Sequence, residues 1–395
     1  PSKRFTYYGS RPKILNPTKI NGIIYSINSA TKHLHLYVFA LLILISSCRD
    51  EKENCCDTIN QESPYFPPKS TNWETTSPSS LGWNTDSIQT LYDNLELNGT
   101  RAYIVLINGK IVLEKYWGKN IFNNSTFDTS TNWYWASAAK TLTSFAVGKA
   151  EEDGRLSLTH KTSNYLGLGW TSLSREQEDK ITIWHQLTMT TGLDDATGSP
   201  DSWKPQDFIY KAEAGKRWAY HNAPYTLLDQ VVENAVGQDF EPYFNMILRD
   251  KIGMDGSWIW SSDNHLFLST ARSAARFGNL ILNYGVWDGT RILNKAYVDA
   301  MTHKSQEINQ AYGYLWWLNN TNSFRIPQSQ VEFPGSLTPN APSDMYSALG
   351  KNGQYICVVP SKKMVIIRMG DNPDSALVPF LYLNDIWKMM NGVIK

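Results

Sequence analysis

The chain is organised around the stretch SAAKTLTSFAV, residues 137–147. From Ser137 to Glu151 the side chains form no continuous polar face, which is typical of a helix buried on all sides. Residues three apart lie on one face of a helix, so Ser137 at the first turn places its hydroxyl beside the amine of Lys140. A lysine can take the proton of a serine where burial or neighbouring positive charge favours its neutral form. The stretch therefore predicts a buried helix that opens with a serine nucleophile and its base.

The same Ser-x-x-Lys spacing occurs twice more, so the pattern alone does not identify a site. The other copies are Ser10 to Lys13 and Ser29 to Lys32, both near the N-terminus. Only the Ser137 copy opens an apolar helix, and only that copy follows an aromatic run, residues 133–135. This context favours Ser137.

The composition excludes several classes of function. A chain of 395 residues with 42% hydrophobic and 13% aromatic content can bury a large core, in one domain or in two packed together. Its 37 basic and 37 acidic residues balance, and no basic patch or zinc-finger spacing suggests a nucleic-acid partner. The seven histidines are scattered, without an H-E-x-x-H motif or a Cys-x-x-Cys pair. We therefore expect no metal and no cofactor.

The N-terminal region is typical of a secreted lipoprotein. Because the first methionine is Met189, we interpret residues 1–31 as an artefact or an upstream extension. Residues 34–45 are mostly apolar but fall short of the ~20 residues that span a bilayer, as in the core of a signal peptide. This run ends at Ser-Ser-Cys48, which resembles the lipobox of bacterial lipoproteins. We expect a signal peptide over 32–48, with an uncleaved anchor as the alternative.

This resemblance implies a lipid on Cys48, which would hold the protein at the bacterial outer membrane, facing the periplasm or the cell surface. The acidic stretch that follows, residues 49–53, resembles the surface-export signal of Bacteroidetes lipoproteins. Residues 60–81 are rich in proline, serine and threonine. We therefore expect a flexible tether over 49–81.

The folded domain is expected over 82–392. An Asn108-Gly109 pair between two apolar runs predicts a β-hairpin, because a two-residue turn needs positive φ angles. The stretch from 181 to 283 is expected to be mostly helical. The remaining elements expected are helices over 86–95 and 376–390 and strands over 345–349, 355–359 and 364–369. Strands at both ends of the chain favour one antiparallel sheet, with the helical middle as an inserted lobe and a cleft between the two.

A serine-lysine site also needs a group that passes a proton to the leaving atom. Tyr220 in Tyr220-His221-Asn222 can do this, with Asn222 orienting Lys140 or the substrate. Of the four Tyr-x-Asn patterns in the chain, only this one is expected in a loop; the others begin at Tyr92, Tyr243 and Tyr382. The alternative is a packing tyrosine in a helix-entry turn.

In their order and spacing, five motifs resemble the serine β-lactamase and penicillin-binding protein superfamily, and most of all its class C branch with esterase and nylon-oligomer-hydrolase relatives. The resemblance covers about residues 80–392. It implies an α/β (α+β) fold, with a five-stranded antiparallel sheet flanked by helices and an inserted all-helical lobe. It also implies that the serine is acylated while the lysine and tyrosine share proton transfer. The motifs are Ser137-x-x-Lys140, IWHQLTMTTGL at 183–193, Tyr220-x-Asn222, YGYLWW at 312–317 and Gly350-x-x-Gly353-Gln354-Tyr355.

One motif of that family, usually Lys-Thr-Gly or His-x-Gly, is not obvious here. We reject residues 351–353 (KNG), because they fall where the family has a turn between two strands. Counting back from that turn without gaps places the motif at 345–347 (MYS), with the N–H of Ala348 as an oxyanion donor. The cation that grips a β-lactam carboxylate is then missing, which argues against penicillins as natural substrates.

These expectations describe a serine hydrolase that cleaves an ester or amide of a small-molecule or peptide-like substrate. The catalytic residues expected are Ser137, Lys140, Tyr220, Asn222 and Ala348. A non-catalytic module that binds a ligand or peptidoglycan on the same fold is the competing interpretation. An α/β-hydrolase triad is disfavoured, because the sequence has no G-x-S-x-G motif.

Overall fold

The computed structural model describes residues 63–394 apart from 71 and 198. The expected signal peptide and the expected lipid site at Cys48 lie outside the described residues. At the centre of the described part is a six-stranded sheet in which all neighbouring strands are antiparallel. Its order is β2 (Lys110–Tyr116), β1 (Thr100–Ile107), β13 (Met364–Gly370), β12 (Gln354–Val359), β11 (Tyr346–Gly350) and β8 (Trp317–Leu318). The two ends of the chain therefore build one sheet, as predicted, and the two-residue β8 extends the five expected strands at one edge.

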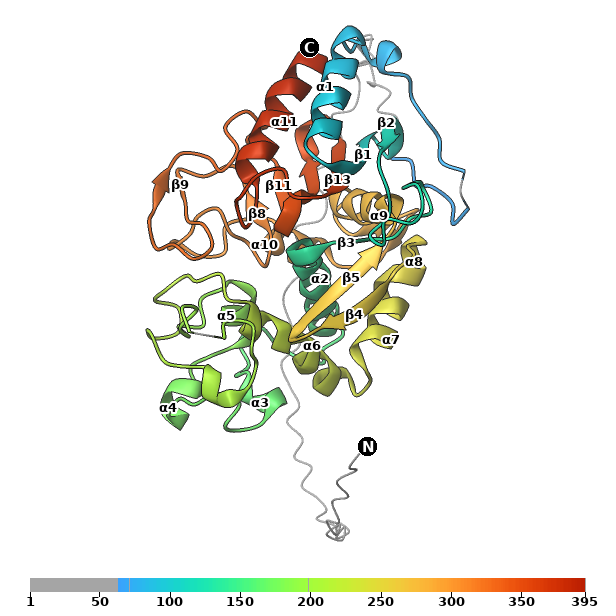
Figure 1. Ribbon diagram of the computed structural model, residues 1–395. Coiled ribbons are helices and arrows are strands. Elements are labelled where there is room, and N and C mark those ends of the chain that lie inside the picture. Colours follow the sequence, from blue (N-terminus) through green and yellow to red (C-terminus); the bar gives the residue numbers. More distant parts are fainter. Residues whose placement is uncertain (1–62, 71, 198, 395) are drawn as a thin grey trace, which may run out of the picture. The chain divides into compact units, whose positions relative to one another are not determined.

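The hairpin between β1 and β2 forms where the sequence predicts it. Asn108 and Gly109 both have positive φ angles, 50° and 85°, as a two-residue turn requires. Residues 102–106 of β1 are completely buried. This burial on both faces follows from the helices that cover the sheet. Helices α1 (Asp86–Leu97) and α11 (Phe380–Val393) pack side by side on one face, and α9 (Ala271–Leu282) packs against the other (Figure 1).

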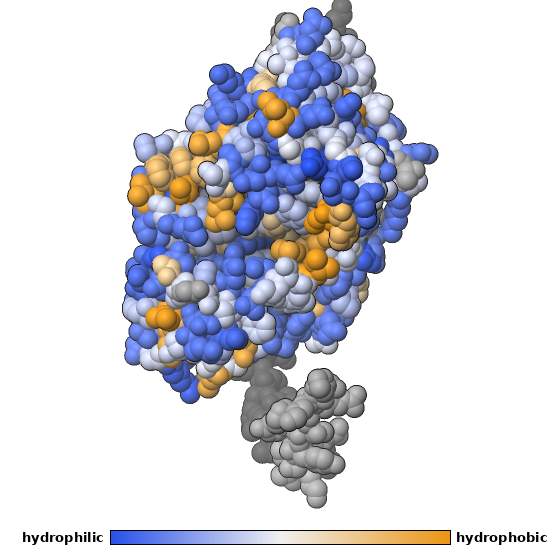
Figure 2. All heavy atoms as spheres, viewed as in Figure 1, coloured by the Kyte–Doolittle hydropathy of each residue, from blue (hydrophilic) through white to orange (hydrophobic). Residues whose placement is uncertain are grey.

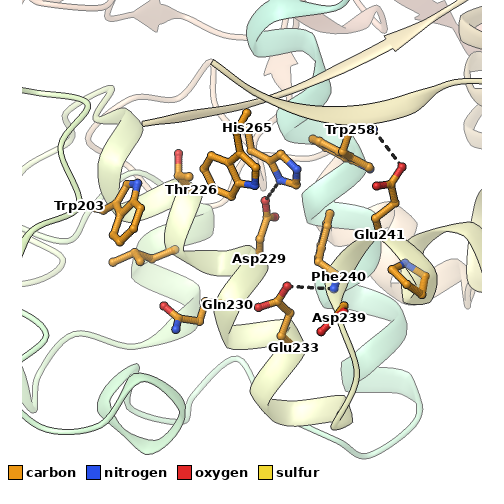
Figure 3. A pocket seen from close by; sticks show the side chains of 13 residues that line it. Trp203, Thr226, Asp229, Gln230, Glu233, Asp239, Phe240, Glu241, Trp258 and His265 are labelled. Carbon is orange, nitrogen blue, oxygen red and sulfur yellow. Dashed lines mark hydrogen bonds and ion pairs between the residues drawn. The ribbon is translucent and has the colours of Figure 1, made fainter. Parts of the chain in front are cut away.

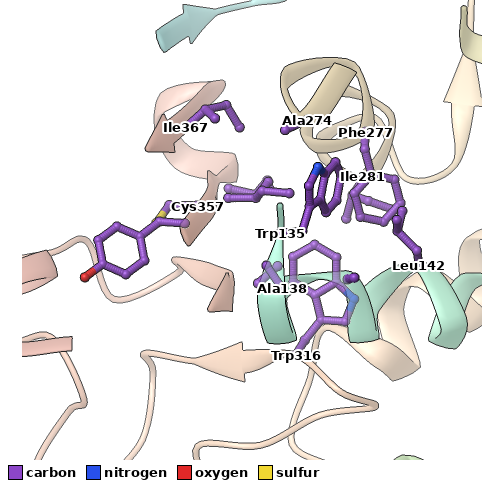
Figure 4. Close-up of a cluster of buried hydrophobic side chains, with 14 of the residues drawn as sticks. Trp135, Ala138, Leu142, Ala274, Phe277, Ile281, Trp316, Cys357 and Ile367 are labelled. Atoms are coloured by element: carbon purple, nitrogen blue, oxygen red, sulfur yellow. The ribbon is translucent and has the colours of Figure 1, made fainter. Parts of the chain in front are cut away.

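The core fixes the start of the central helix α2 (Lys140–Glu152). Figure 4 shows Trp135, Ala138 and Leu142 packed among side chains of α9 and the sheet. The rings of Trp135 and Phe277 lie 6.1 Å apart, and Phe277 stacks on Trp316 at 6.0 Å. Side chains on both sides of Ser137 are therefore held by the main core, which fixes the backbone of the serine turn.

The lobe that the chain inserts between the strands of its two ends begins with helices, as expected. Its helices are α3 (Ser163–Leu166), α4 (Arg175–Glu178), α5 (Ile183–Leu187), α6 (Asn222–Val236), α7 (Phe240–Phe244) and α8 (Asp250–Ile252). The structure differs from the expectation further along, because β4 (Ser257–Ser261) and β5 (Asn264–Ser269) form a hairpin within the stretch expected to be mostly helical. The hairpin pairs with β3 (Trp133–Tyr134) in a second sheet. Aromatic residues in β4 and β5 suit a pleated, half-buried surface.

The described part of the expected tether is packed against the domain. Thr76 N–H donates to the carbonyl of Ile111 at 2.8 Å, and Ile111 N–H donates to the carbonyl of Glu74 at 3.0 Å. The indole of Trp73 is buried and donates to the carbonyl of Gly109 at 2.8 Å. Residues 73–76 thus run along the start of β2 as a strap, which gives partners to backbone groups of this edge strand. The prediction of a flexible tether does not hold for these residues.

The hydropathy of the surface and of the helices shows how the domain relates to water and to a bilayer. The face shown in Figure 2 is mostly hydrophilic, with apolar residues in small separate groups. Among the described residues, no helix has both the length and the apolar character needed to cross a bilayer.

Candidate active site

The structure places Ser137 in a tight turn at the head of α2. Residues Ala136–Ala139 form a single 3-10 turn, and α2 begins at the next residue. Ala136 has a φ of 47°, a left-handed conformation that is uncommon for a residue with a Cβ. Backbone strain of this kind persists where the surrounding structure enforces it, and it is frequent at functional sites. Here the enforcing structure is the buried core around Trp135 and Ala138.

Lys140 and Ser137 are in direct contact, as the sequence predicts. The Nζ of Lys140 lies 3.0 Å from the Oγ of Ser137. Lys140 is 4% exposed, and its Nζ lies over the aromatic rings of Tyr225 and Tyr220, at 4.1 and 5.2 Å from their centroids. Burial lowers the pKa of Lys140 to about 7, although the negative charge of Asp201 opposes this shift. A substantial fraction of this amine is therefore neutral at physiological pH and can accept a proton.

Tyr220 lies at the same point, held by a cluster of aromatic rings. Its ring stacks on Trp317 at 5.9 Å and meets Tyr312 edge-on at 6.3 Å. The motif at 312–317 thus supplies two aromatic rings that pack against this tyrosine. Burial raises the pKa of Tyr220, and a hydrogen bond with Ser137 opposes that rise. The phenol is therefore protonated near neutral pH and lies within reach of the serine.

Asn222 is the first residue of α6 and is linked to Lys140 only indirectly. Its side-chain N–H donates to the Oδ1 of Asp201 at 2.7 Å, and Asn264 donates to the other oxygen of that carboxylate at 3.2 Å. The Oδ1 of Asn222 is buried and has no hydrogen-bond partner within the described part of the chain. Asp201 was not predicted from the sequence. It lies in a loop without any recognisable motif, and tertiary structure alone brings its charge to Lys140.

The strand register conflicts with the predicted role of Ala348. Residues of an antiparallel strand point their N–H groups alternately to one neighbour and to the other. Asn319 N–H donates to the carbonyl of Met345, so the backbone groups of Met345 face β8. Those of Ser347, two residues further on, face β8 as well, where Ser347 pairs with Trp317. Ala348 lies one residue further on, so its N–H points to the other neighbour, β12, where it pairs with Ile356. That N–H belongs to the sheet and is not available to an oxyanion.

The end of β11, two residues beyond Ala348, is the part that touches the serine turn. A Cβ added at Gly350 would lie 2.4 Å from the carbonyl oxygen of Trp135 and 3.0 Å from the backbone nitrogen of Ala138. The next N–H along the strand, that of Lys351, is on the open edge, since the N–H of Gly350 points to β12. The Lys351 side chain is exposed. The glycine at 350 was the sequence signal for this close approach.

No metal site accompanies these groups. Among the described residues, no cluster of three or more histidine, cysteine or carboxylate side chains is arranged to hold a metal ion. The serine, lysine and tyrosine can perform acyl transfer with their own acid and base groups.

Comparisons with known proteins show the family of this chain. The sequence matches the family described as Beta-lactamase over residues 99–375. An uncharacterized protein of Alkalihalophilus pseudofirmus is 24% identical over 332 residues, which is 76% of this chain and 91% of the relative. A solved structure from Bacillus anthracis, provisionally named a 6-aminohexanoate-dimer hydrolase, is similar in fold with a TM-score of 0.63 and 18% identity, over 84% of this chain and 90% of the other. A family VIII carboxylesterase is also similar in fold, with a TM-score of 0.58 and 12% identity, over 76% and 97%. The chain belongs to the beta-lactamase family.

Proposed function

We propose that this protein is a serine hydrolase that forms an acyl-enzyme on Ser137 and cleaves an ester or amide. The observation that carries the proposal is the 3.0 Å contact between Lys140 and Ser137, with burial lowering the lysine pKa to about 7. A buried lysine costs folding free energy unless its charge is lost or paired. A neutral amine beside a hydroxyl is the arrangement that activates a serine.

In the proposed reaction, neutral Lys140 takes the proton of Ser137 as the serine Oγ attacks the substrate carbonyl carbon. The tetrahedral intermediate collapses when the bond to the leaving oxygen or nitrogen breaks, and the leaving atom receives a proton through Tyr220. Water then attacks the acyl-enzyme and gives up its proton to the same pair of groups. This step releases the acid and restores the Ser137 hydroxyl.

The developing oxyanion needs two N–H donors. We assign these to Ser137 and Lys351 in place of Ala348. Ser137 lies in the first turn of a helix, where backbone N–H groups have no intrahelical partner. Lys351 N–H is on the open edge beside Gly350, which is in contact with the serine turn. The donor is a backbone group, so the charge of the Lys351 side chain is not needed for this role.

The groups at the site and the names of the similar structures support the proposed substrate class. One of these is named for hydrolysis of an amide and another for hydrolysis of an ester. β11 (Tyr346–Gly350) carries no cationic side chain that could bind a carboxylate. Esters and amides of small or peptide-like molecules are therefore favoured over penicillins.

A binding module on the same fold is the competing function, and covalent labelling distinguishes the two. We expect a fluorophosphonate to add one adduct to the native chain and none to Ser137→Ala, as measured by intact-mass spectrometry. An adduct on both chains, or on neither, would contradict a Ser137 nucleophile. Turnover of p-nitrophenyl esters, D-amino-acid amides and nitrocefin would then identify the substrate class.

We also propose lipid attachment at Cys48, which would place the domain at the bacterial outer membrane. The support is the apolar run that ends at Ser-Ser-Cys48. In a bacterial host, the native chain should be processed and sediment with membranes, whereas Cys48→Ser should remain unprocessed. Processing of both chains would refute lipidation at this cysteine.

A further inference from the structure

A pocket lies within the helical lobe. It is bounded by the helices α6 and α7 and by the β4–β5 hairpin (Figure 3). Its volume of about 460 Å³ is typical of small-molecule sites. Ser137, Lys140 and Tyr220 do not line it, so it is separate from the proposed active site. We call it the tryptophan pocket. Its lining includes Trp203, Asp229, Glu233, Asp239, Glu241, Trp260 and His265.

Aromatic rings form one side of the tryptophan pocket. Trp260 stacks flat on His265, with centroids 4.3 Å apart and planes 5° from parallel. The ring of Trp203 lies 6.5 Å from that of Trp260. Trp203 and Trp260 are 42% and 56% exposed, which is high for such large apolar side chains. Part of the Trp203 ring and the Trp260 surface turned away from His265 are therefore available to a ligand.

Carboxylates form the other side, and no lysine or arginine lines the pocket. Glu233 accepts a hydrogen bond from the N–H of Phe240, and Glu241 accepts one from the N–H of Trp258. Both carboxylates are thus held in place by backbone groups. Asp239 makes no side-chain hydrogen bond or ion pair with any described residue. The pocket therefore carries an excess of negative charge on a fixed frame.

The fourth carboxylate belongs to Asp229 and is buried at the base of the pocket. It accepts hydrogen bonds from His265 at 2.7 Å and from Thr143 at 3.1 Å. Burial raises the pKa of Asp229, the contacts with His265 and Thr143 oppose that rise, and the nearby charge of Glu233 adds to it. Asp229 and Glu233 therefore repel each other, and a bound cation would relieve that repulsion.

We propose that the tryptophan pocket binds an organic cation with an apolar body, such as an arylalkyl ammonium. The ammonium group would be attracted both to the carboxylates and to the faces of the tryptophan rings, which carry negative partial charge. The apolar body would cover the exposed parts of Trp203 and Trp260. A sugar could also stack on tryptophan, but a neutral ligand would leave the excess negative charge unbalanced.

Calorimetric titration of the purified full chain with a matched pair of probes tests this proposal. The pair is 2-phenylethylammonium chloride and 2-phenylethanol, which are similar in shape and differ in charge. We expect the ammonium to bind at least tenfold more tightly than the alcohol. Equal affinity for the two probes, no ammonium binding at 20 mM, or binding of cellobiose in preference to the ammonium would overturn the proposal.

Variants then locate the binding. Asp239→Asn with Glu241→Gln should weaken ammonium binding at least fivefold, because it removes two charges while keeping the oxygen that accepts the hydrogen bond of Trp258 N–H. The matched control is Glu96→Gln with Glu176→Gln, two exposed glutamates outside the pocket. Trp260→Ala should also weaken binding. Equal losses in the pocket and control variants would show an effect of net charge alone and would contradict a site here. Circular dichroism would confirm that each variant is folded.

Discussion

The Ser137 site and the tryptophan pocket each contain a hydroxyl beside a buried titratable group whose pKa is shifted. The two regions differ in what this contact can do. In the first, burial drives the Lys140 amine toward its neutral form beside a hydroxyl. In the second, burial raises the pKa of Asp229, but the histidine and the threonine that contact it both bond the carboxylate directly. Thr143 is completely buried, so no substrate can reach its hydroxyl. A shifted pKa indicates catalysis only where the nucleophile beside the shifted group is open to a substrate.

The largest expected effect is the loss of activity on substitution of Ser137, which belongs to only one of the two regions. Ser137→Ala should lower kcat by at least about a thousandfold, because no other group can form the acyl-enzyme. The fold should survive, since loss of a hydroxyl at a helix start costs at most about 1 to 2 kcal/mol. Steady-state kinetics on an active ester and the thermal midpoint Tm measure the two effects. Turnover by the folded variant at a tenth of the native rate would rule out Ser137.

The next effect tests the assigned oxyanion donor. Lys351→Pro removes the backbone N–H and should lower kcat by about a hundredfold to a thousandfold. Gly350 has φ of −127° and ψ of 161°, a conformation that a residue before proline adopts readily. Lys351→Ala keeps the N–H and should stay within about threefold of the native rate, because that side chain is exposed. If both variants lost activity equally, the side chain would be the group that matters.

The pH dependence tests the role of Asp201. Lys140 must be neutral to act as a base, so kcat/KM should rise with pH and level off above about pH 7. The negative charge of Asp201 favours the protonated amine. Asp201→Asn should therefore move the rise to lower pH. Glu241→Gln, which removes a carboxylate from the tryptophan pocket, should leave the profile in place. A shift to higher pH in Asp201→Asn would show that its hydrogen bonds to Asn222 and Asn264 outweigh its charge.

The smallest expected effect concerns the independence of the two regions. Asp239→Asn should change kcat/KM for a neutral ester by less than about twofold, because the residue is exposed and lies outside the Ser137 site. Kinetics with and without saturating 2-phenylethylammonium give the same comparison by a second route. A larger change in either measurement would show that the two regions are coupled.

Local signals explain what could be predicted from the sequence. Asn108-Gly109 specifies a turn through its own φ angles, and the spacing of Ser137 and Lys140 specifies a contact on one helical face. The role of Ala348 failed for a different reason. The residue of β11 that meets the serine turn depends on the length of the loop at the end of this strand, and the sequence around Ala348 does not fix that length. Because successive N–H groups face opposite neighbours, an error of one residue selects a donor on the wrong side of the strand. Asp201 had no local signal, because its contact with Asn222 depends on how a loop folds back.

The strap formed by residues 73–76 occupies the first part of the outer edge of β2. An exposed edge strand offers a row of unpaired backbone groups to any other strand, which is a common route to aggregation. Here the groups of Ile111 are already bonded to Glu74 and Thr76, and Trp73 covers the turn beyond. Any cleavage or truncation that removed the strap would free the backbone groups of Ile111. The domain would then keep its active site and offer a longer free edge to a strand of another copy.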